Sequence, residues 1–212
     1  MEQIDYSKEP ENKIEFTRRF DKSYSKYAKI YDLLVKIFPI WKKWICQVIP
    51  YIEGRKVLEV SFGTGYLLTK YAAQYQTYGI DLNKDLIEIT KKNLEKKNIK
   101  ANLQQGNVEK LPFKNNFFDS IINTMAFTGY PDGKLAMNEL IRVLKPKGKL
   151  IIVDFNYPKN RNRIGVFIAK FMGKSGDIIR DMDKLFKSFN LEYTDEEIGA
   201  FGSVHLYIAK NK

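Results

Sequence analysis

Cysteine and histidine are nearly absent from this chain of 212 residues, which contains one of each, Cys46 and His205. One thiol cannot form a disulfide within the chain. One thiol and one histidine also cannot supply the ligands of a structural zinc site or an iron–sulfur cluster. The sequence therefore predicts no metal site, and its sparing use of cysteine is typical of the reducing cytoplasm.

Long apolar runs are also missing. No stretch of 18 apolar residues occurs, and the first residues mix acidic, basic and polar side chains instead of placing an apolar run after a basic segment. We therefore expect no signal peptide, no membrane span and a cytoplasmic location. A chain of this length that is 44% hydrophobic is long enough for one well-packed domain and short for two.

The central feature of the chain is a short apolar strand, a turn of small residues and the start of a helix, over residues 56–67. Gly63 and Gly65 allow the turn to adopt positive φ angles and leave room for a ligand against the backbone. A dinucleotide-binding turn would place a third glycine where this chain has Leu68, and a P-loop would need a Lys-Ser/Thr pair after the glycines. A nicotinamide-dependent dehydrogenase is thereby disfavoured, and a P-loop is excluded.

A second strand, over Tyr78 to Ile80, ends in the carboxylate of Asp81, which lies 22 positions after Glu59. In open α/β sheets an acid at this place accepts hydrogen bonds from the ribose hydroxyls of a bound nucleotide. The sequence therefore predicts a ligand that contains a ribose.

Four segments together resemble the class I S-adenosylmethionine-dependent methyltransferases, and the resemblance is strong from Arg55 to Phe155. One departure is Ser61, which stands at the family's usual first glycine; serine is small and can donate a hydrogen bond, so we interpret it as a tolerated variant. The segments are Glu59–Gly65, Asp81, Gly106–Phe113 and Leu140–Leu150.

This resemblance implies a cofactor site. Glu59 would lie near the methionine amine, Gly63 and Gly65 near its carboxylate and the ribose, and Asp81 would accept from the ribose hydroxyls. The segment after the third strand would contact the adenine ring, and Asn123 marks the exit of the fourth strand, where family members perform their chemistry. The full predicted set is Glu59, Ser61, Gly63, Gly65, Asp81, Leu82, Asn107, Val108 and Asn123.

The resemblance also implies a Rossmann-like α/β fold: a seven-stranded sheet of order 3-2-1-4-5-7-6 with the last strand antiparallel and helices on both faces. We expect one domain made of four parts: a helical N-terminal lid over 1–54, a cofactor-binding core over 55–155, a basic amphipathic insert over 156–176, and a C-terminal helix and β-hairpin over 177–212.

Several local features follow from short patterns. Residues 1–16 are polar and predict a frayed arm, and aromatic residues at helical spacing predict a helix from Phe20 to Pro39. Thr64 is expected to cap a helix over about 64–74, and Asn83 a helix over about 84–97. Residues 145–149 predict a turn before a fifth strand.

Three residues are candidate catalytic groups. Tyr27 and Tyr31 lie in a segment that resembles the lid of quinone-biosynthesis C-methyltransferases, where tyrosines approach the cofactor and the substrate; the alternative is that they form the buried stripe of an amphipathic helix. His205, early in the last strand, has a pKa suited to a general base, although a lone strand histidine is more often structural.

The excess of basic residues, 36 against 25 acidic for a formal charge of +11, favours polyanionic partners. The insert at 156–176 carries five basic residues and no acidic one, and its apolar residues recur at helical spacing. It is a lid on the substrate pocket or a surface helix that contacts an anionic membrane peripherally, and contact with nucleic acid is the least favoured alternative. Base methylation in DNA is disfavoured because the segment after the fourth strand lacks both the Asn/Asp-Pro-Pro-aromatic quartet and a nucleophilic cysteine.

These observations predict an enzyme that transfers a methyl group from S-adenosylmethionine to a small-molecule or lipid-like acceptor. The resemblance is closest to the quinone-ring C-methyltransferases and the phospholipid N-methyltransferases. Two alternatives remain open at this point: an RNA methyltransferase or RNA-binding protein, and a catalytically silent subunit that binds the cofactor without turnover.

Overall fold

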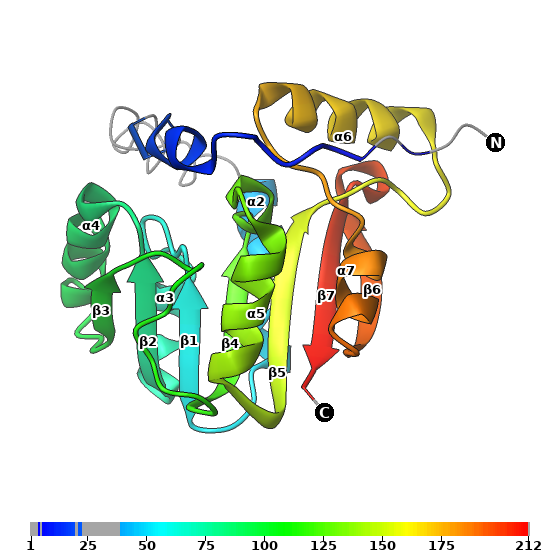
Figure 1. Ribbon diagram of the computed structural model, residues 1–212. Coiled ribbons are helices and arrows are strands. Elements are labelled where there is room, and N and C mark those ends of the chain that lie inside the picture. Colours follow the sequence, from blue (N-terminus) through cyan, green and yellow to red (C-terminus); the bar gives the residue numbers. More distant parts are fainter. Residues whose placement is uncertain (1–3, 5, 20, 23–38, 212) are drawn as a thin grey trace.

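The computed structural model describes residues 4, 6–19, 21–22 and 39–211, and its centre is one seven-stranded sheet (Figure 1). The strand order is β3-β2-β1-β4-β5-β7-β6, as predicted, and β7 is antiparallel to both of its neighbours. The strands are β1 (Lys56–Val60), β2 (Gln76–Asp81), β3 (Asn102–Gln105), β4 (Phe118–Thr124), β5 (Leu144–Phe155), β6 (Glu192–Gly199) and β7 (Val204–Lys210).

Alternating residues of the central strands divide the core into two apolar clusters, one on each face of the sheet. Leu58 of β1 belongs to the cluster that includes residues of α5 and α7, whereas its neighbour Val57 belongs to the cluster that includes residues of α2, α3 and α4. The helices are α2 (Pro39–Cys46), α3 (Leu68–Tyr71), α4 (Lys84–Glu95), α5 (Gly133–Val143), α6 (Arg163–Ser175) and α7 (Met182–Ser188).

The strand order reverses between β1 and β4, so the loops after these strands diverge at the carboxyl edge of the sheet and leave a crevice there. Two helices that begin at this edge are capped by side chains. Asn83 accepts from the Leu86 N–H at 3.0 Å, which confirms the predicted cap, and Asp132 accepts from the Leu135 N–H at 2.8 Å. The caps fix where α4 and α5 begin beside the crevice.

Two local predictions are wrong. Thr64 caps no helix: α3 begins at Leu68 without a side-chain cap, because the loop after β1 is held by α4 instead, through hydrogen bonds from Thr90 to the Gly63 carbonyl and from Asn93 to the Thr64 carbonyl. The fifth strand, predicted to begin after a turn at 145–149, begins earlier: β5 already pairs with β4 at Leu144, and its pairing resumes at Lys149 after an irregularity in which Lys147 has a φ of 62°.

The described part of the N-terminal arm, residues 4 and 6–16, is also not frayed. Ser7 exchanges two hydrogen bonds with Ile179, from the Ser7 N–H at 2.9 Å and to its hydroxyl at 3.0 Å. Glu9 accepts from the Gly133 N–H at 3.0 Å, and Phe16 is buried. In Figure 1 this blue segment crosses the upper ends of the strands below α6. Specific hydrogen bonds hold the arm on the protein, although its polar composition predicted a segment exposed to solvent.

The lid predicted over 1–54 is described only in part, since Tyr27, Tyr31 and most of the helix predicted between Phe20 and Pro39 lie outside the described residues. Within the described part of the chain, no helix has both the length and the apolar character needed to cross a membrane.

Candidate active site

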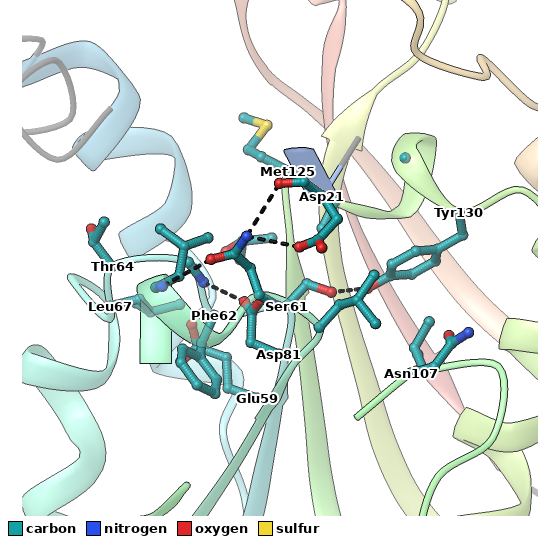
Figure 2. A pocket seen from close by; sticks show the side chains of 18 of the residues that line it. Asp21, Glu59, Ser61, Phe62, Thr64, Leu67, Asp81, Asn107, Met125 and Tyr130 are labelled. Atoms are coloured by element: carbon teal, nitrogen blue, oxygen red, sulfur yellow. Dashed lines mark hydrogen bonds between the residues drawn. The ribbon is translucent and has the colours of Figure 1, made fainter. Parts of the chain in front are cut away.

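A pocket opens at the crevice, at the carboxyl ends of β1, β2 and β4 (Figure 2). Its walls come from the loops after β1, β2, β3 and β4, together with Trp41 and Ile45 of α2 and with Thr17 and Asp21 of the N-terminal segment. Side chains from the N-terminal segment and from the loops of the sheet therefore meet at the place where an open α/β sheet binds its ligands.

The turn after β1 is left-handed at three positions. Gly63 and Gly65 have φ of 55° and 71°, and a Cβ on Gly65 would lie 2.3 Å from the side chain of Thr90, so only glycine fits there. Ser61 has φ of 53°, a conformation that costs energy for a residue with a Cβ, and its N–H donates to the Ile80 carbonyl at 2.7 Å. The serine that departs from the family pattern thus carries backbone strain.

Asp81 joins the loops after β1 and β2. Its carboxylate is buried and accepts from the backbone N–H groups of Gly63 and Asn83, both at 2.9 Å. Burial raises the pKa of Asp81 to about 6, and the two backbone hydrogen bonds oppose that rise. Asp81 lines the pocket as the ribose assignment requires, and this assignment stays a prediction.

Glu59 lies deeper, at the end of β1. Its side chain accepts a hydrogen bond of 2.9 Å from the hydroxyl of Tyr71, and burial raises its pKa to about 8. The carboxyl group is therefore largely protonated at neutral pH, and a cationic ligand group beside it would favour release of that proton.

The predicted adenine contacts also line the pocket. Asn107 and Val108 follow β3, and Leu82 follows Asp81, so the three residues flank one region of the wall. Asn107 accepts from the Glu109 N–H at 2.9 Å, which fixes its amide. A Cβ on Gly106 would approach Ile80 to 2.5 Å, so the chain has glycine where the loop passes closest to the sheet.

Tyr130, which the sequence reading did not single out, links two of the predicted residues. Its hydroxyl lies 2.8 Å from the Ser61 hydroxyl (Figure 2). The same hydroxyl accepts from the side-chain amide of Asn123. Asn123 itself is fully buried, and its Oδ1 has no partner among the described residues. An amide N–H only donates, so the Tyr130 oxygen accepts from Asn123, and either hydroxyl of the Tyr130–Ser61 pair can donate to the other.

A pair of carboxyl groups lies at the same end of the pocket as Tyr130. Asp177 lines the wall, and the Thr128 hydroxyl lies 2.9 Å from its Oδ1 and 3.1 Å from Oδ1 of the buried Asp154. Burial raises the pKa of both carboxyl groups, that of Asp154 to about 6. The sequence reading missed Asp177, although an acid directly after a basic insert was a visible signal.

His205 does not lie at the pocket. It is buried in β7, where its ring nitrogens contact Oδ1 of Asp195 at 2.7 Å and the Tyr157 carbonyl at 3.1 Å. With both nitrogens engaged by the protein, the structure favours the structural interpretation of His205. Among the described residues, no group of three or more histidine, cysteine, aspartate and glutamate side chains is arranged to hold a metal.

The remaining chemistry of the pocket fits S-adenosylmethionine. Two buried acids, Glu59 and Asp81, lie at one end, where a cationic amine and two ribose hydroxyls would satisfy them. Leu82, Leu86 and Val108 supply an apolar wall for a flat ring beside them. No basic side chain is among the lining residues that the structure describes, so the pocket suits a ligand with a positive charge.

Comparison with known proteins agrees with this geometry. The sequence profile of the ubiE/COQ5 methyltransferase family matches residues 8–198. A ubiquinone/menaquinone biosynthesis C-methyltransferase of Shewanella piezotolerans is 31% identical over 185 residues, which cover 82% of this chain and 71% of the relative.

Solved structures are similar in fold. The YcgJ protein of Bacillus subtilis is 18% identical, with a TM-score of 0.69 over 81% of this chain and 99% of its own. An S-adenosylmethionine-dependent methyltransferase of Thermotoga maritima is 17% identical, with a TM-score of 0.68 over 89% of this chain and 100% of its own. At these identities the structural likeness shows the fold alone.

Proposed function

Since the chain belongs to the ubiE/COQ5 methyltransferase family and is an S-adenosylmethionine-dependent methyltransferase, we propose that its acceptor is a hydroxylated aromatic ring, of the quinol kind, on a lipophilic molecule. The relative cited above is named for C-methylation in ubiquinone and menaquinone biosynthesis. The comparisons lend no support to an RNA methyltransferase or to a catalytically silent subunit.

The cofactor would be held by the residues at the acidic end of the pocket. Glu59 would bind the methionine amine, Asp81 the ribose hydroxyls, and Asn107, Val108 and Leu82 the adenine ring. When bound, S-adenosylmethionine supplies a methyl group on a positively charged sulfur. The protein's task is then to align the acceptor with that methyl group and to exclude water.

We infer the chemical class of the acceptor from the residues that line the end of the pocket away from Glu59 and Asp81. Met125, Ala126 and Pro131 contribute apolar surface there, and Tyr130 and Asp177 contribute a hydroxyl and a carboxylate. A flat apolar ring would pack against the first set, and a ring hydroxyl would hydrogen-bond to the second. A sugar or a charged metabolite would leave most of its polar groups unpaired against these walls.

To test this function, the protein is incubated with methyl-labelled S-adenosylmethionine and a short-chain demethylated quinol, and the label is traced by mass. We expect label on a ring carbon. Label on an added phospholipid amine or on RNA, with none on the quinol, would contradict the proposed acceptor.

We also propose that the acceptor is reached from an anionic membrane surface through α6. This helix lies above the carboxyl edge of the sheet (Figure 1) and exposes Ile164, Phe167 and Phe171 by 53%, 69% and 58%. Arg163, Lys170 and Lys174 belong to the same helix, which has no acidic residue. Exposed aromatics with basic neighbours are typical of helices that lie at a lipid interface.

Sedimentation with vesicles tests this contact. The protein should bind vesicles of anionic phospholipid and not those of zwitterionic phospholipid, because the basic residues need negative headgroups. Phe167→Ser and Phe171→Ser should each weaken binding about tenfold, since each removes apolar area from the lipid. Leu135→Ser, an exposed apolar residue of α5, is the control. Equal binding by all variants would contradict the proposed contact.

A further inference from the structure

Methylation of a ring carbon next to a hydroxyl is assisted when the hydroxyl loses its proton, because the charge left on oxygen makes the carbon a better nucleophile. His205 lies outside the pocket and cannot take that proton. Among the described residues, the carboxyl groups that line the pocket are those of Asp21, Glu59, Asp81 and Asp177. The base, if it is a carboxylate of this part of the chain, is one of these four.

Each of the four carboxyl groups accepts a hydrogen bond from the protein, so their position in the pocket distinguishes them. Asp81 accepts two backbone hydrogen bonds, Glu59 accepts from Tyr71, and Asp21 accepts from the side chain of Asn83 at 2.7 Å. These three also lie toward the cofactor end of the pocket, around the turn after β1 and the start of α4. Asp177 is the carboxyl group at the acceptor end of the pocket, the end lined by Met125, Ala126, Tyr130 and Pro131.

Asp177 is held firmly against this wall. The N–H of the next residue, Ile178, donates to the Thr128 carbonyl at 2.7 Å, and Arg180 donates to the carbonyls of Phe127 and Tyr130. These bonds join the segment 177–180 to the loop after β4. Only Oδ1 of Asp177 has a partner among the described residues, the Thr128 hydroxyl. Oδ2 is therefore left for a ligand.

The neighbouring carboxyl group of Asp154 explains why the Thr128 hydroxyl can hydrogen-bond to Asp177. Asp154 accepts from the backbone N–H groups of Thr128 and Phe155, at 3.0 and 2.7 Å, so it is satisfied as an anion without the Thr128 hydroxyl. The single hydroxyl proton of Thr128 can then point to Asp177. Burial raises the pKa of Asp177, which makes it a better proton acceptor, and burial together with the charge of Asp177 raises the pKa of Asp154, which interacts with Arg180.

We propose that Asp177 is the base that takes the hydroxyl proton of the methyl acceptor. This inference rests on the proposed quinol acceptor. The acceptor O–H bond breaks and its proton goes to a carboxylate oxygen of Asp177. The electron pair left on oxygen supports a new bond from the adjacent ring carbon to the methyl carbon, while the carbon–sulfur bond breaks and its electrons stay on sulfur. The ring carbon then loses its hydrogen to water as a proton, and the oxygen recovers its proton from Asp177.

Tyr130 is the other polar group at this end, and it is suited to position the acceptor rather than to accept its proton. Its hydroxyl is engaged by the Ser61 hydroxyl at 2.8 Å and by the Asn123 amide, and burial moves the pKa of the phenol above its ordinary value. A neutral phenol of that kind does not accept a proton from another phenol.

Binding of 4-nitrophenol without cofactor tests the proposal independently of turnover, with 4-nitroanisole as the matched probe that has no hydroxyl proton. Asp177→Asn keeps an oxygen for Thr128 but cannot take a proton. We expect this variant to bind neutral 4-nitrophenol about tenfold more weakly than the unmodified protein, because a charge-assisted hydrogen bond is lost, and to bind 4-nitroanisole equally well. Asp183→Asn, at an exposed acid of α7, should change neither affinity.

Equal affinity of Asp177→Asn and the unmodified protein for 4-nitrophenol, or no measurable binding by either, would overturn the proposal. Methyl transfer to a quinol gives a second readout. The kcat of Asp177→Asn should fall at least one hundredfold while its affinity for S-adenosylhomocysteine is unchanged. Transfer at the same rate by both proteins would reject Asp177 as base and leave the proposed function standing. Absence of transfer by the unmodified protein would reject the acceptor, and the nitrophenol comparison would still decide on Asp177.

Discussion

Replacing Ser61 with glycine changes two opposing contributions to the free energy of unfolding: the backbone strain at this residue and the hydrogen bond of its side chain. Ser61 has φ of 53°, and a left-handed conformation costs a residue with a Cβ about 1–2 kcal/mol, which glycine does not incur. The same substitution deletes the 2.8 Å hydrogen bond to Tyr130, with a net worth of about 0.5–1.5 kcal/mol. Because these magnitudes are similar, the free energy of unfolding of Ser61→Gly should lie within about 1 kcal/mol of the original value.

Ser61→Ala is the matched control, because alanine keeps the Cβ and the strained φ and removes only the hydroxyl. It should lower the free energy of unfolding by about 1 kcal/mol. The difference between the glycine and alanine variants then measures the strain by itself, and we expect it to be about 1–2 kcal/mol in favour of glycine.

Tyr130→Phe completes the test. This substitution leaves the buried Asn123 amide without its acceptor and should cost about 2 kcal/mol in the Ser61 protein. In the Ser61→Ala background it should cost about 1 kcal/mol less, since the bond between the two hydroxyls is already gone. Urea unfolding of the single and double variants gives these values. A coupling below about 0.3 kcal/mol would refute the hydrogen-bonded chain from Asn123 through Tyr130 to Ser61.

Three further predictions concern other parts of the site. Asp81→Asn should weaken S-adenosylhomocysteine binding at least tenfold in calorimetry, because a carboxylate that accepts from two donors becomes an amide that accepts with one oxygen. Glu59 holds a proton up to a pH of about 8 in the folded protein and loses it near its ordinary pKa of 4.5 when unfolded. Its contribution to stability is therefore present below pH 4.5 and lost as the pH rises to 8. Relative to Glu59→Gln, the original protein should lose roughly 1.4 kcal/mol per pH unit across that window. Glu9→Ala should lower the hydrogen-exchange protection of the Gly133 N–H by about 1 kcal/mol, because that amide loses its acceptor.

The sheet could be predicted from the sequence because its signals are local. Short segments rich in apolar residues, such as Val57 to Val60, are followed by glycines or by a carboxylate, and each such boundary marks the carboxyl end of a strand. The family resemblance then supplied the strand order. Asp81 and the turn at 61–65 were found in the same way, since the residues that place them lie within a few positions.

The acceptor end could not be found by such signals, because its residues come together only in the folded chain. Tyr130 meets Ser61 across 69 positions, and Thr128 meets Asp177 across 49. No local spacing relates these pairs. The same limit explains why His205 was considered as a base, since its partners on Asp195 and Tyr157 are visible only once β6 and β7 pair.

The N-terminal arm connects the two ends of the pocket. Its first part, through Ser7 and Glu9, binds Ile179, Arg180 and Gly133 at the acceptor wall. Its later part reaches the other end, where the Asn83 amide donates to the carbonyl and carboxylate oxygens of Asp21 beside the loop that carries Asp81.

One segment therefore contacts both the wall that carries Asp177 and the loop that carries Asp81, and Thr17 between these contacts lines the pocket itself. We therefore expect a ligand that strengthens the arm's contacts at one end to tighten ligand binding at the other. Such coupling suits a transfer reaction in which the methyl donor and the acceptor must be enclosed together and kept from water.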